Sequence, residues 1–231
     1  SSASCDEVWV VSRGAGENLR SLGYEGDYIV MENGVDVPRG RVSDEAIAAA
    51  TGRYDLPQNV PVFLFVGRLM WYKGIRIILD ALKTLREKNV DFRMVFVGEG
   101  ADGAEIRSYA EERKLSDRCF FTGAISDREI IRAWYGRSDL FLFPSTFDTN
   151  GLVVREAAAS GTATVMIRNS CASEGVGDGR NGFCIEENAA AMATKLEELC
   201  RAPEVMQVVG ENAQRELYVS WETAVQRAMA R

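Results

Sequence analysis

Two carboxylates stand eight positions apart in the stretch STFDTNGLVVREAAASGTA, where they enclose a glycine and an apolar run. Gly151 is predicted to begin a helix, with Thr149 or Asn150 as its N-cap. Asp148 would then lie at the mouth of this helix, and Glu156 on its second turn. Carboxylates accept strong, directional hydrogen bonds, so the pair could hold two parts of one polyol ligand. The alternative is an acid favoured by the helix dipole and a second acid on a solvated helix face.

Two cations follow the apolar run PVFLFVG, in the stretch GRLMWYKG. Arg68 and Lys73 stand directly before a helical pattern, and a helix N-terminus with cations beside it attracts anions, most often phosphate. Gly67 and Gly74 allow a ligand to come close to the backbone. The stretch therefore indicates an anion site, with a turn that carries two solvated cations as the alternative.

The stretch GEGADG, residues 98–103, matches the pattern GxGxxG between an apolar run and a helical pattern. This pattern is typical of a dinucleotide site when it lies in the first strand–helix unit. Here it lies in the second unit, and the following run CFFTG ends without the acid that would hold a ribose hydroxyl. We interpret the glycines as those of a tight turn, and an NAD-dependent oxidoreductase stays an alternative.

Composition excludes several kinds of chemistry. The chain has 231 residues, a net charge of −7 and no strongly basic stretch, which argues against nucleic-acid binding. It has no histidine, which removes Ser-His-Asp and Cys-His mechanisms and, with five scattered cysteines, argues against a zinc site. Scattered cysteines are typical of reduced thiols, and no apolar run approaches the roughly 18 residues of a membrane span. We expect a cytoplasmic protein.

The elements that would position these residues alternate between apolar runs and amphipathic stretches. Continuous apolar strands joined by helices are typical of a parallel sheet covered on both faces, in which ligands bind at the carboxyl ends of the strands. The sequence therefore predicts an α/β, Rossmann-like fold. Ser126 and Glu129 predict a capping box for one helix. Strands are expected at 61–67, 92–98, 119–123, 139–144, 163–167 and 183–185, and helices at 74–88, 104–115, 126–137 and 151–160.

The two ends of the chain differ from this series. A strand, a helix and a second strand are expected at 5–12, 14–23 and 27–36, and a short helix from Ser43. Three helices are expected at about 188–200, 204–217 and 221–230. The last helix has Trp221, Val225 and Met229 on one face. We interpret this stripe as core packing; the alternatives are packing against residues 1–36 and an exposed apolar patch.

Taken together, GRLMWYKG, VFVGEG, FFTGAIS, DLFLFPSTFDTNGLVVREAAASGT and EGVGDGRNGF resemble, in this order, the donor half of family-four retaining glycosyltransferases with the GT-B fold. Asp148 and Glu156 resemble that family's E-x7-E motif, with Asp in place of the first Glu. NGVD resembles its interdomain linker. The resemblance implies the tail of an N-terminal domain and the linker over 1–37, a nucleotide-sugar-binding domain over 38–202 and C-terminal helices over 203–231.

The resemblance also implies a role for each matching residue. Arg68 and Lys73 would bind the donor diphosphate, Glu156 the ribose hydroxyls, and Asp148 the sugar ring. Asp148 is one methylene shorter than the family's Glu, so its sugar contact is expected to differ. Backbone contacts to the base, sugar and phosphates, or close-approach turns, are implied at Gly67, Gly98, Gly100, Gly123, Ala124, Ile125, Asn150, Gly151 and Leu152.

The implied activity is glycosyl transfer with retention and without a metal ion or other cofactor, as a hexosyltransferase, with UDP-glucose as the first choice of donor. The resemblance implies that most of the N-terminal, acceptor-binding domain lies outside this chain, so this chain alone is expected to bind a nucleotide sugar with little or no transfer. That domain is an expected partner, and peripheral membrane association of the full-length enzyme is a further expectation. A GT-B-like sugar-nucleotide epimerase and a non-catalytic nucleotide-sugar-binding module stay alternatives.

Overall fold

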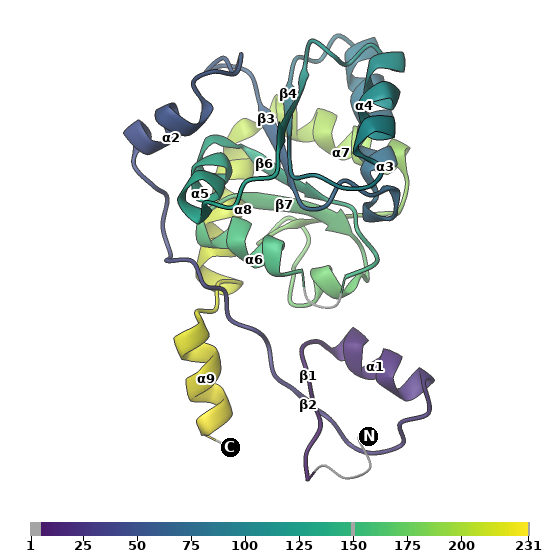
Figure 1. Cartoon of the computed structure of the whole chain (residues 1–231), viewed down its shortest axis with the longest axis vertical. Helices are drawn as coiled ribbons and strands as arrows, with labels where there is room; N and C mark the ends of the chain where they lie inside the picture. The colour runs from purple at the N-terminus through teal and green to yellow at the C-terminus, as the bar shows by residue number, and fades with distance from the viewer. Residues whose placement is uncertain (1–5, 149–150, 231) are drawn as a thin grey trace.

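A six-stranded parallel sheet forms the centre of the protein (Figure 1). The computed structural model describes residues 6–148 and 151–230. The strands follow the order β5-β4-β3-β6-β7-β8, so the chain builds the sheet outward from β3 in one direction and then from β6 in the other. The strands are β3 (Val62–Val66), β4 (Arg93–Val97), β5 (Cys119–Gly123), β6 (Leu140–Phe143), β7 (Ala163–Ile167) and β8 (Phe183–Ile185).

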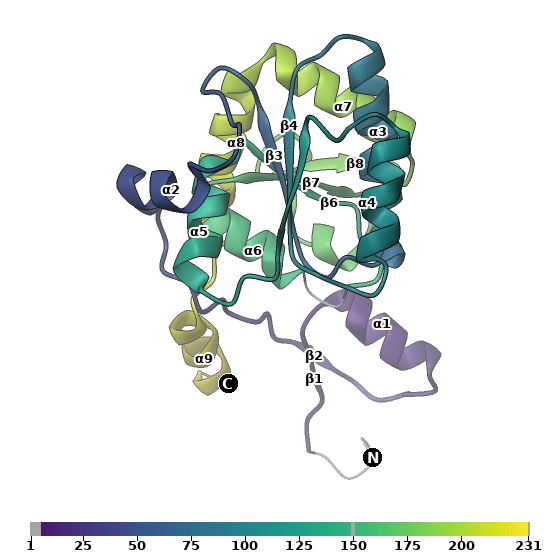
Figure 2. The same cartoon turned by 45° about the horizontal axis from the view of Figure 1, so that its top comes forward.

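Helices cover both faces of this sheet, which explains the continuous apolar strands (Figure 2). Alternate strand residues point to opposite faces. Phe63 and Phe65 of β3 therefore pack with one layer of helices, while Leu64 packs with the other. The first layer contains α3 (Ile75–Glu87), α4 (Gly103–Glu112) and α7 (Ala189–Arg201), and the second contains α5 (Arg128–Arg137) and α6 (Leu152–Ala159). The predicted α/β, Rossmann-like fold is confirmed.

Two predicted helix starts are corrected. Helix α5 is capped by Asp127, whose carboxylate accepts from the backbone N–H groups of Glu129 and Ile130, and not by Ser126. Asp127 has the extended backbone that an N-cap requires. Gly151 precedes α6 as its N-cap in the left-handed conformation, so it is not the first helical residue. The capping role expected of Thr149 or Asn150 lies outside the described residues.

The N-terminal residues form a separate small unit below the main sheet in Figure 1. Strands β1 (Trp9–Val10) and β2 (Ile29–Val30) pair in parallel, and α1 (Arg13–Ser21) connects them. These strands are much shorter than the predicted runs, because the pairing extends only from Trp9 with Ile29 to Val10 with Val30. The chain then reaches α2 (Asp44–Thr51), the short helix that was expected from Ser43. Ser43 is its N-cap, and α2 packs against α5.

The last helix, α9 (Trp221–Met229), lies beside the N-terminal unit and away from the sheet (Figure 1). Helix α8 (Pro203–Glu216) is the last to pack on the sheet unit. The apolar stripe of α9 is exposed: Trp221 is 47%, Val225 49% and Met229 82% accessible. The prediction of core packing is therefore wrong, because the chain leaves the sheet after α8.

Two further observations concern the expectations from composition. Four cysteines, Cys119, Cys171, Cys184 and Cys200, are free thiols, as expected, and Cys5 lies outside the described residues. Within residues 6–148 and 151–230, no helix combines the length and apolar character needed to cross a membrane.

Candidate functional site

The loops after β3, β4 and β5 are joined through their backbones at the carboxyl edge of the sheet. The N–H of Gly67 donates to Val97 O at 3.0 Å, and the N–H of Gly98 donates to Gly123 O at 2.9 Å. A Cβ on Gly98 would lie 1.9 Å from Gly67 O, and one on Gly100 would lie 2.3 Å from Leu69 O. The first two glycines of GEGADG, Gly98 and Gly100, are therefore required by contact between the two loops, which accounts for them without a dinucleotide.

Lys73 is placed by a short 3₁₀ helix, η2 (Trp71–Lys73), in the loop after β3. The side chain of Asp102 accepts from Trp71 N at 2.8 Å and holds the start of η2. Gly74 ends it in the left-handed conformation, with φ of 77°, and a Cβ there would lie 2.2 Å from Pro144 O. This close approach brings the loop after β3 against the loop after β6.

The two loops meet at an ion pair. The Lys73 ammonium lies 2.9 Å from Asp148 Oδ2, and both side chains are largely buried. The other predicted cation, Arg68, is exposed and donates to the hydroxyl of Tyr72 at 2.9 Å. The ring of Tyr72 meets the ring of Phe147 edge-on, with 6.1 Å between the centroids. The structure thus gathers both predicted cations and the first predicted acid at one place.

The mouth of α6 opens beside this ion pair. The N–H of Gly151 donates to Asp148 Oδ1 at 3.3 Å, so Asp148 contacts both Lys73 and the residue before the helix. Leu152, the first helical residue, is 40% exposed. The first amide groups of a helix have no partner within it and attract anions. Asn150, which was expected to contribute its backbone here, lies outside the described residues.

Glu156 lies on the second turn of α6, half-buried against α5. Its Oε2 lies 3.5 Å from the hydroxyl of the buried Tyr135, which also donates to Val153 O at 3.2 Å. Burial raises the pKa of Glu156 above its ordinary value, while the Tyr135 hydroxyl and the charge of Arg128 act in the opposite direction. Its position argues against a solvated helix face. Tyr135 was not singled out from the sequence, because its helical spacing marks only a buried position.

The predicted base-contacting residues lie at the end of β5 and directly after it. Gly123, the last residue of β5, has a φ of 80°, Ala124 is exposed, and Ile125 packs partly against the core. Their backbone therefore lies at the same edge of the sheet as the other predicted residues. Among the described residues, no group of three or more His, Cys, Asp or Glu side chains is arranged to hold a metal ion.

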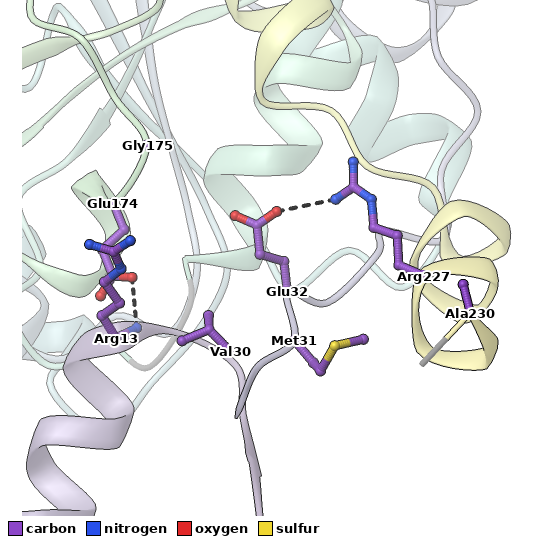
Figure 3. Close-up of a pocket in the computed structure, with 8 residues that line it drawn as sticks. All are labelled: Arg13, Val30, Met31, Glu32, Glu174, Gly175, Arg227 and Ala230. Atoms are coloured by element: carbon purple, nitrogen blue, oxygen red, sulfur yellow. Dashed lines mark hydrogen bonds and ion pairs between the residues drawn. The ribbon is translucent and has the colours of Figure 1, made fainter. Parts of the chain in front are cut away.

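A separate cavity of about 880 Å³ lies between the N-terminal unit, the loop after β7 and α9 (Figure 3). In it, the carboxylate of Glu174 accepts from the backbone N–H groups of Arg13 and Gly14, at 2.8 and 2.7 Å. Glu32 faces Arg227, at 3.5 Å. None of the predicted site residues is among those that line it. The residues that line the cavity are Arg13, Val30, Met31, Glu32, Glu174, Gly175, Arg227 and Ala230.

The order of the strands places the predicted site where a sheet of this kind usually binds its ligand. Ligands of doubly wound α/β sheets bind at the carboxyl ends of the strands, where the order reverses. In this sheet the reversal falls between the neighbours β3 and β6, whose following loops carry Lys73 and Asp148. The fold and this arrangement define a doubly wound, Rossmann-like α/β domain with a candidate ligand site where the strand order reverses.

Comparison with known families narrows this class. The model of the family described as "Glycosyl transferases group 1" matches residues 49–216, and the chain belongs to this family. Among its relatives, a D-inositol 3-phosphate glycosyltransferase 2 of Catenulispora acidiphila is 30% identical over 209 residues, which cover 86% of this chain and 48% of the relative. A GDP-mannose-dependent mannosyltransferase of Mycobacterium tuberculosis is 32% identical over 138 residues, 60% of this chain and 35% of the relative.

Solved structures show the same fold. HepE of Anabaena, crystallised with UDP and glucose, superposes with a TM-score of 0.86 at 22% identity, over 98% of this chain and 62% of that one. A glycosyltransferase of Rickettsia africae superposes with a TM-score of 0.82 at 23% identity, over 97% and 62%. The predicted fold, the C-terminal half of a GT-B fold, is confirmed. The chain spans about half the length of the curated relatives that it matches.

Proposed function

We propose that this chain is the donor-binding half of a retaining glycosyltransferase and binds a nucleotide sugar at the junction of β3 and β6. The observation that carries the proposal is the meeting of Lys73, Asp148 and the mouth of α6 at the point where the strand order reverses. The family match supports the reaction class. HepE, which shares the fold, is known with UDP and UDP-glucose, and we propose a UDP-sugar, with UDP-glucose as the first choice.

The proposed chemistry is charge stabilisation on the leaving diphosphate. Arg68 and Lys73 would bind its oxygens together with the first amide groups of α6, where charge develops as the glycosidic bond breaks. This proposal requires no metal ion, because the two side chains supply the positive charge. Asp148 would face the sugar ring, and Glu156 would accept hydrogen bonds from the ribose hydroxyls. The backbone from Gly123 to Ile125 would contact the base.

Transfer itself is proposed for the longer protein, with an acceptor bound mainly by residues outside this chain. Relatives of the family act on different substrates, as the names inositol 3-phosphate glycosyltransferase and GDP-mannose-dependent mannosyltransferase state. The acceptor therefore cannot be carried over from them. An NAD-dependent oxidoreductase is disfavoured, because its glycine pattern would belong after β3, whereas GEGADG follows β4 and packs against the loop after β3.

The test is a calorimetric titration of the chain with UDP, UDP-glucose, UDP-N-acetylglucosamine, GDP-mannose and NAD. We expect saturable binding of one nucleotide sugar, which Arg68→Ala and Glu156→Ala both abolish or weaken at least tenfold. Lys83→Ala, which removes an exposed cation of α3 paired with Glu87, is the matched control and should bind normally. Binding of NAD alone, or equal binding by all variants, would contradict the proposal.

A further inference from the structure

A buried arginine lies directly before Glu156 and has no part in the proposed chemistry. Arg155 is 8% exposed, although its helix, α6, carries Glu156 towards the site. A buried guanidinium is costly unless its hydrogen-bonding groups find partners. The two hydrogen-bond partners of Arg155 belong neither to the sheet nor to the helices of its own layer. They therefore connect α6 to other parts of the chain.

Both partners belong to the segments that leave the sheet unit. Nη1 of Arg155 donates to Leu217 O at 3.0 Å, and Leu217 follows α8 on the way to α9. Nη2 of Arg155 donates to Glu32 Oε1 at 3.2 Å, and Glu32 follows β2 on the way to α2. Arg155 therefore contacts both chain crossings that connect the sheet unit to the N-terminal unit and α9 (Figure 1).

The two crossings are themselves joined beside Arg155. The N–H of Val35 donates to Val219 O at 2.9 Å, and Val35 forms a parallel bridge with Ser220. The hydroxyl of Tyr218 donates to Val37 O at 3.1 Å. A Cβ on Gly34 would lie 2.4 Å from the backbone of Trp221, so the chains run in close contact. The crossings thus form one element, and a side chain that binds both can transmit its position.

Glu32 extends this element to the last helix. Its Oε2 lies 3.5 Å from Nη1 of Arg227, while its Oε1 accepts from Arg155 (Figure 3). Glu32 is half-exposed and Arg227 more so, which makes their pair weak. The Arg155 side chain is only 10% exposed, so its contact with Glu32 is the stronger of the two.

We propose that Arg155 is a positioning residue, which fixes α6, and with it Glu156 and the helix mouth, to the crossings at 32–37 and 217–221. A change in the position of the N-terminal unit would then change the geometry of the site. By thermodynamic reciprocity, a ligand that favours one position of α6 would in turn favour one position of the crossings. The effect of a ligand on the crossings rests on the proposed function, whereas the positioning of α6 by Arg155 does not.

The experiment compares hydrogen exchange in the unliganded chain and in the variant Glu32→Gln, which keeps the shape of an exposed side chain and removes its charge. We expect exchange in α6, residues 152–159, to become about 3- to 10-fold faster, and exchange in α3 to stay unchanged. Arg227→Gln is the matched control, because it removes the weaker partner of the same carboxylate, and α6 should change less than twofold. Unchanged exchange of α6 in Glu32→Gln would overturn the proposal, whatever the chain binds.

A second arm uses UDP as the probe and Arg155→Lys, which keeps the charge but loses the forked geometry. We expect UDP to slow hydrogen exchange at residues 29–37 in the unaltered chain. In both Arg155→Lys and Glu32→Gln, this protection should be lost and the affinity for UDP should fall three- to tenfold. If Arg155 were purely structural, Arg155→Lys would lower the thermal stability and leave the affinity for UDP unchanged. That result would contradict the coupling. If the unaltered chain binds no nucleotide, the proposed function fails, while the exchange of α6 without ligand still decides the positioning role.

Discussion

The ammonium of Lys73 lies 2.9 Å from a carboxylate oxygen of Asp148, although the two residues are 75 positions apart in the chain. The pair joins the loops after β3 and β6, the two neighbouring strands from which the sheet grows in opposite directions. It follows that Asp148 acts on Lys73, in addition to the sugar contact proposed for it. The predictions below use this arrangement.

Asp148→Asn is expected to separate nucleotide binding from sugar recognition. Loss of the carboxylate frees Lys73 and removes a negative charge near the diphosphate, so the affinity for UDP should rise about two- to fivefold. The preference for UDP-glucose over UDP should fall, because the proposed sugar contact is lost. Calorimetry with both ligands measures the two effects. A parallel loss of both affinities would indicate that Asp148 serves only to hold Lys73.

Lys73→Ala is expected to weaken the binding of UDP far more than the binding of uridine. A hydrogen bond to a charged group contributes about 1.5–3 kcal/mol, which corresponds to about 10- to 150-fold in affinity for the diphosphate. Uridine lacks the phosphates and should bind the variant as it binds the unaltered chain. Competition of the two ligands in one titration series measures the difference. Equal losses for both would place Lys73 away from the diphosphate.

Glu156→Gln is expected to stabilise the unliganded protein more at high pH than at low pH. Burial raises the pKa of Glu156, so the folded protein binds this proton more tightly than the unfolded chain does. The stabilising effect of that proton is present at low pH and is lost as pH rises through the folded pKa. Thermal melts of both proteins between pH 4 and 8 should diverge in favour of the variant as pH rises.

The same substitution should act oppositely on binding. The Glu156 carboxylate is the proposed acceptor for ribose hydroxyls, so UDP affinity should fall as pH decreases through its raised pKa. This part of the pH dependence should be absent in Glu156→Gln, which binds UDP weakly at every pH. A pH profile that is the same in both proteins would contradict the ribose role.

Gly98→Ala is expected to destabilise the protein by about 3 kcal/mol, from the steric clash and the left-handed backbone together. Its φ is 138°, and its Cβ would lie 1.9 Å from Gly67 O, so the loop carrying Arg68 and Lys73 would have to move. Gly179→Ala is the matched control, since Gly179 has a φ of 74° but open space around it, and should cost only about 1 kcal/mol. Denaturant unfolding compares the two variants, and similar losses would show that the contact between loops is unimportant.

Much of the fold could be predicted because local patterns carry it. The continuous apolar run from Val62 to Val66 indicates a strand buried on both faces, and the observed strand has all five residues buried. Helix boundaries were less secure, since neighbouring polar residues compete for the cap, and Asp127 rather than Ser126 took this position at α5. The prediction that Trp221, Val225 and Met229 pack in the core was wrong for another reason. Helical periodicity shows that a face is apolar and does not show what covers it.

By itself, the sequence determined the α/β sheet, the loops that end at its carboxyl edge and the residue types in those loops, because strand burial and turn chemistry are read from neighbouring residues. Only the tertiary structure decided the pairing of Lys73 with Asp148, the burial of Glu156 against Tyr135 and the contact of Arg155 with Glu32. These contacts join positions from 21 to 123 residues apart. Their geometry depends on strand order and on the course of the chain after α8, which no local pattern encodes.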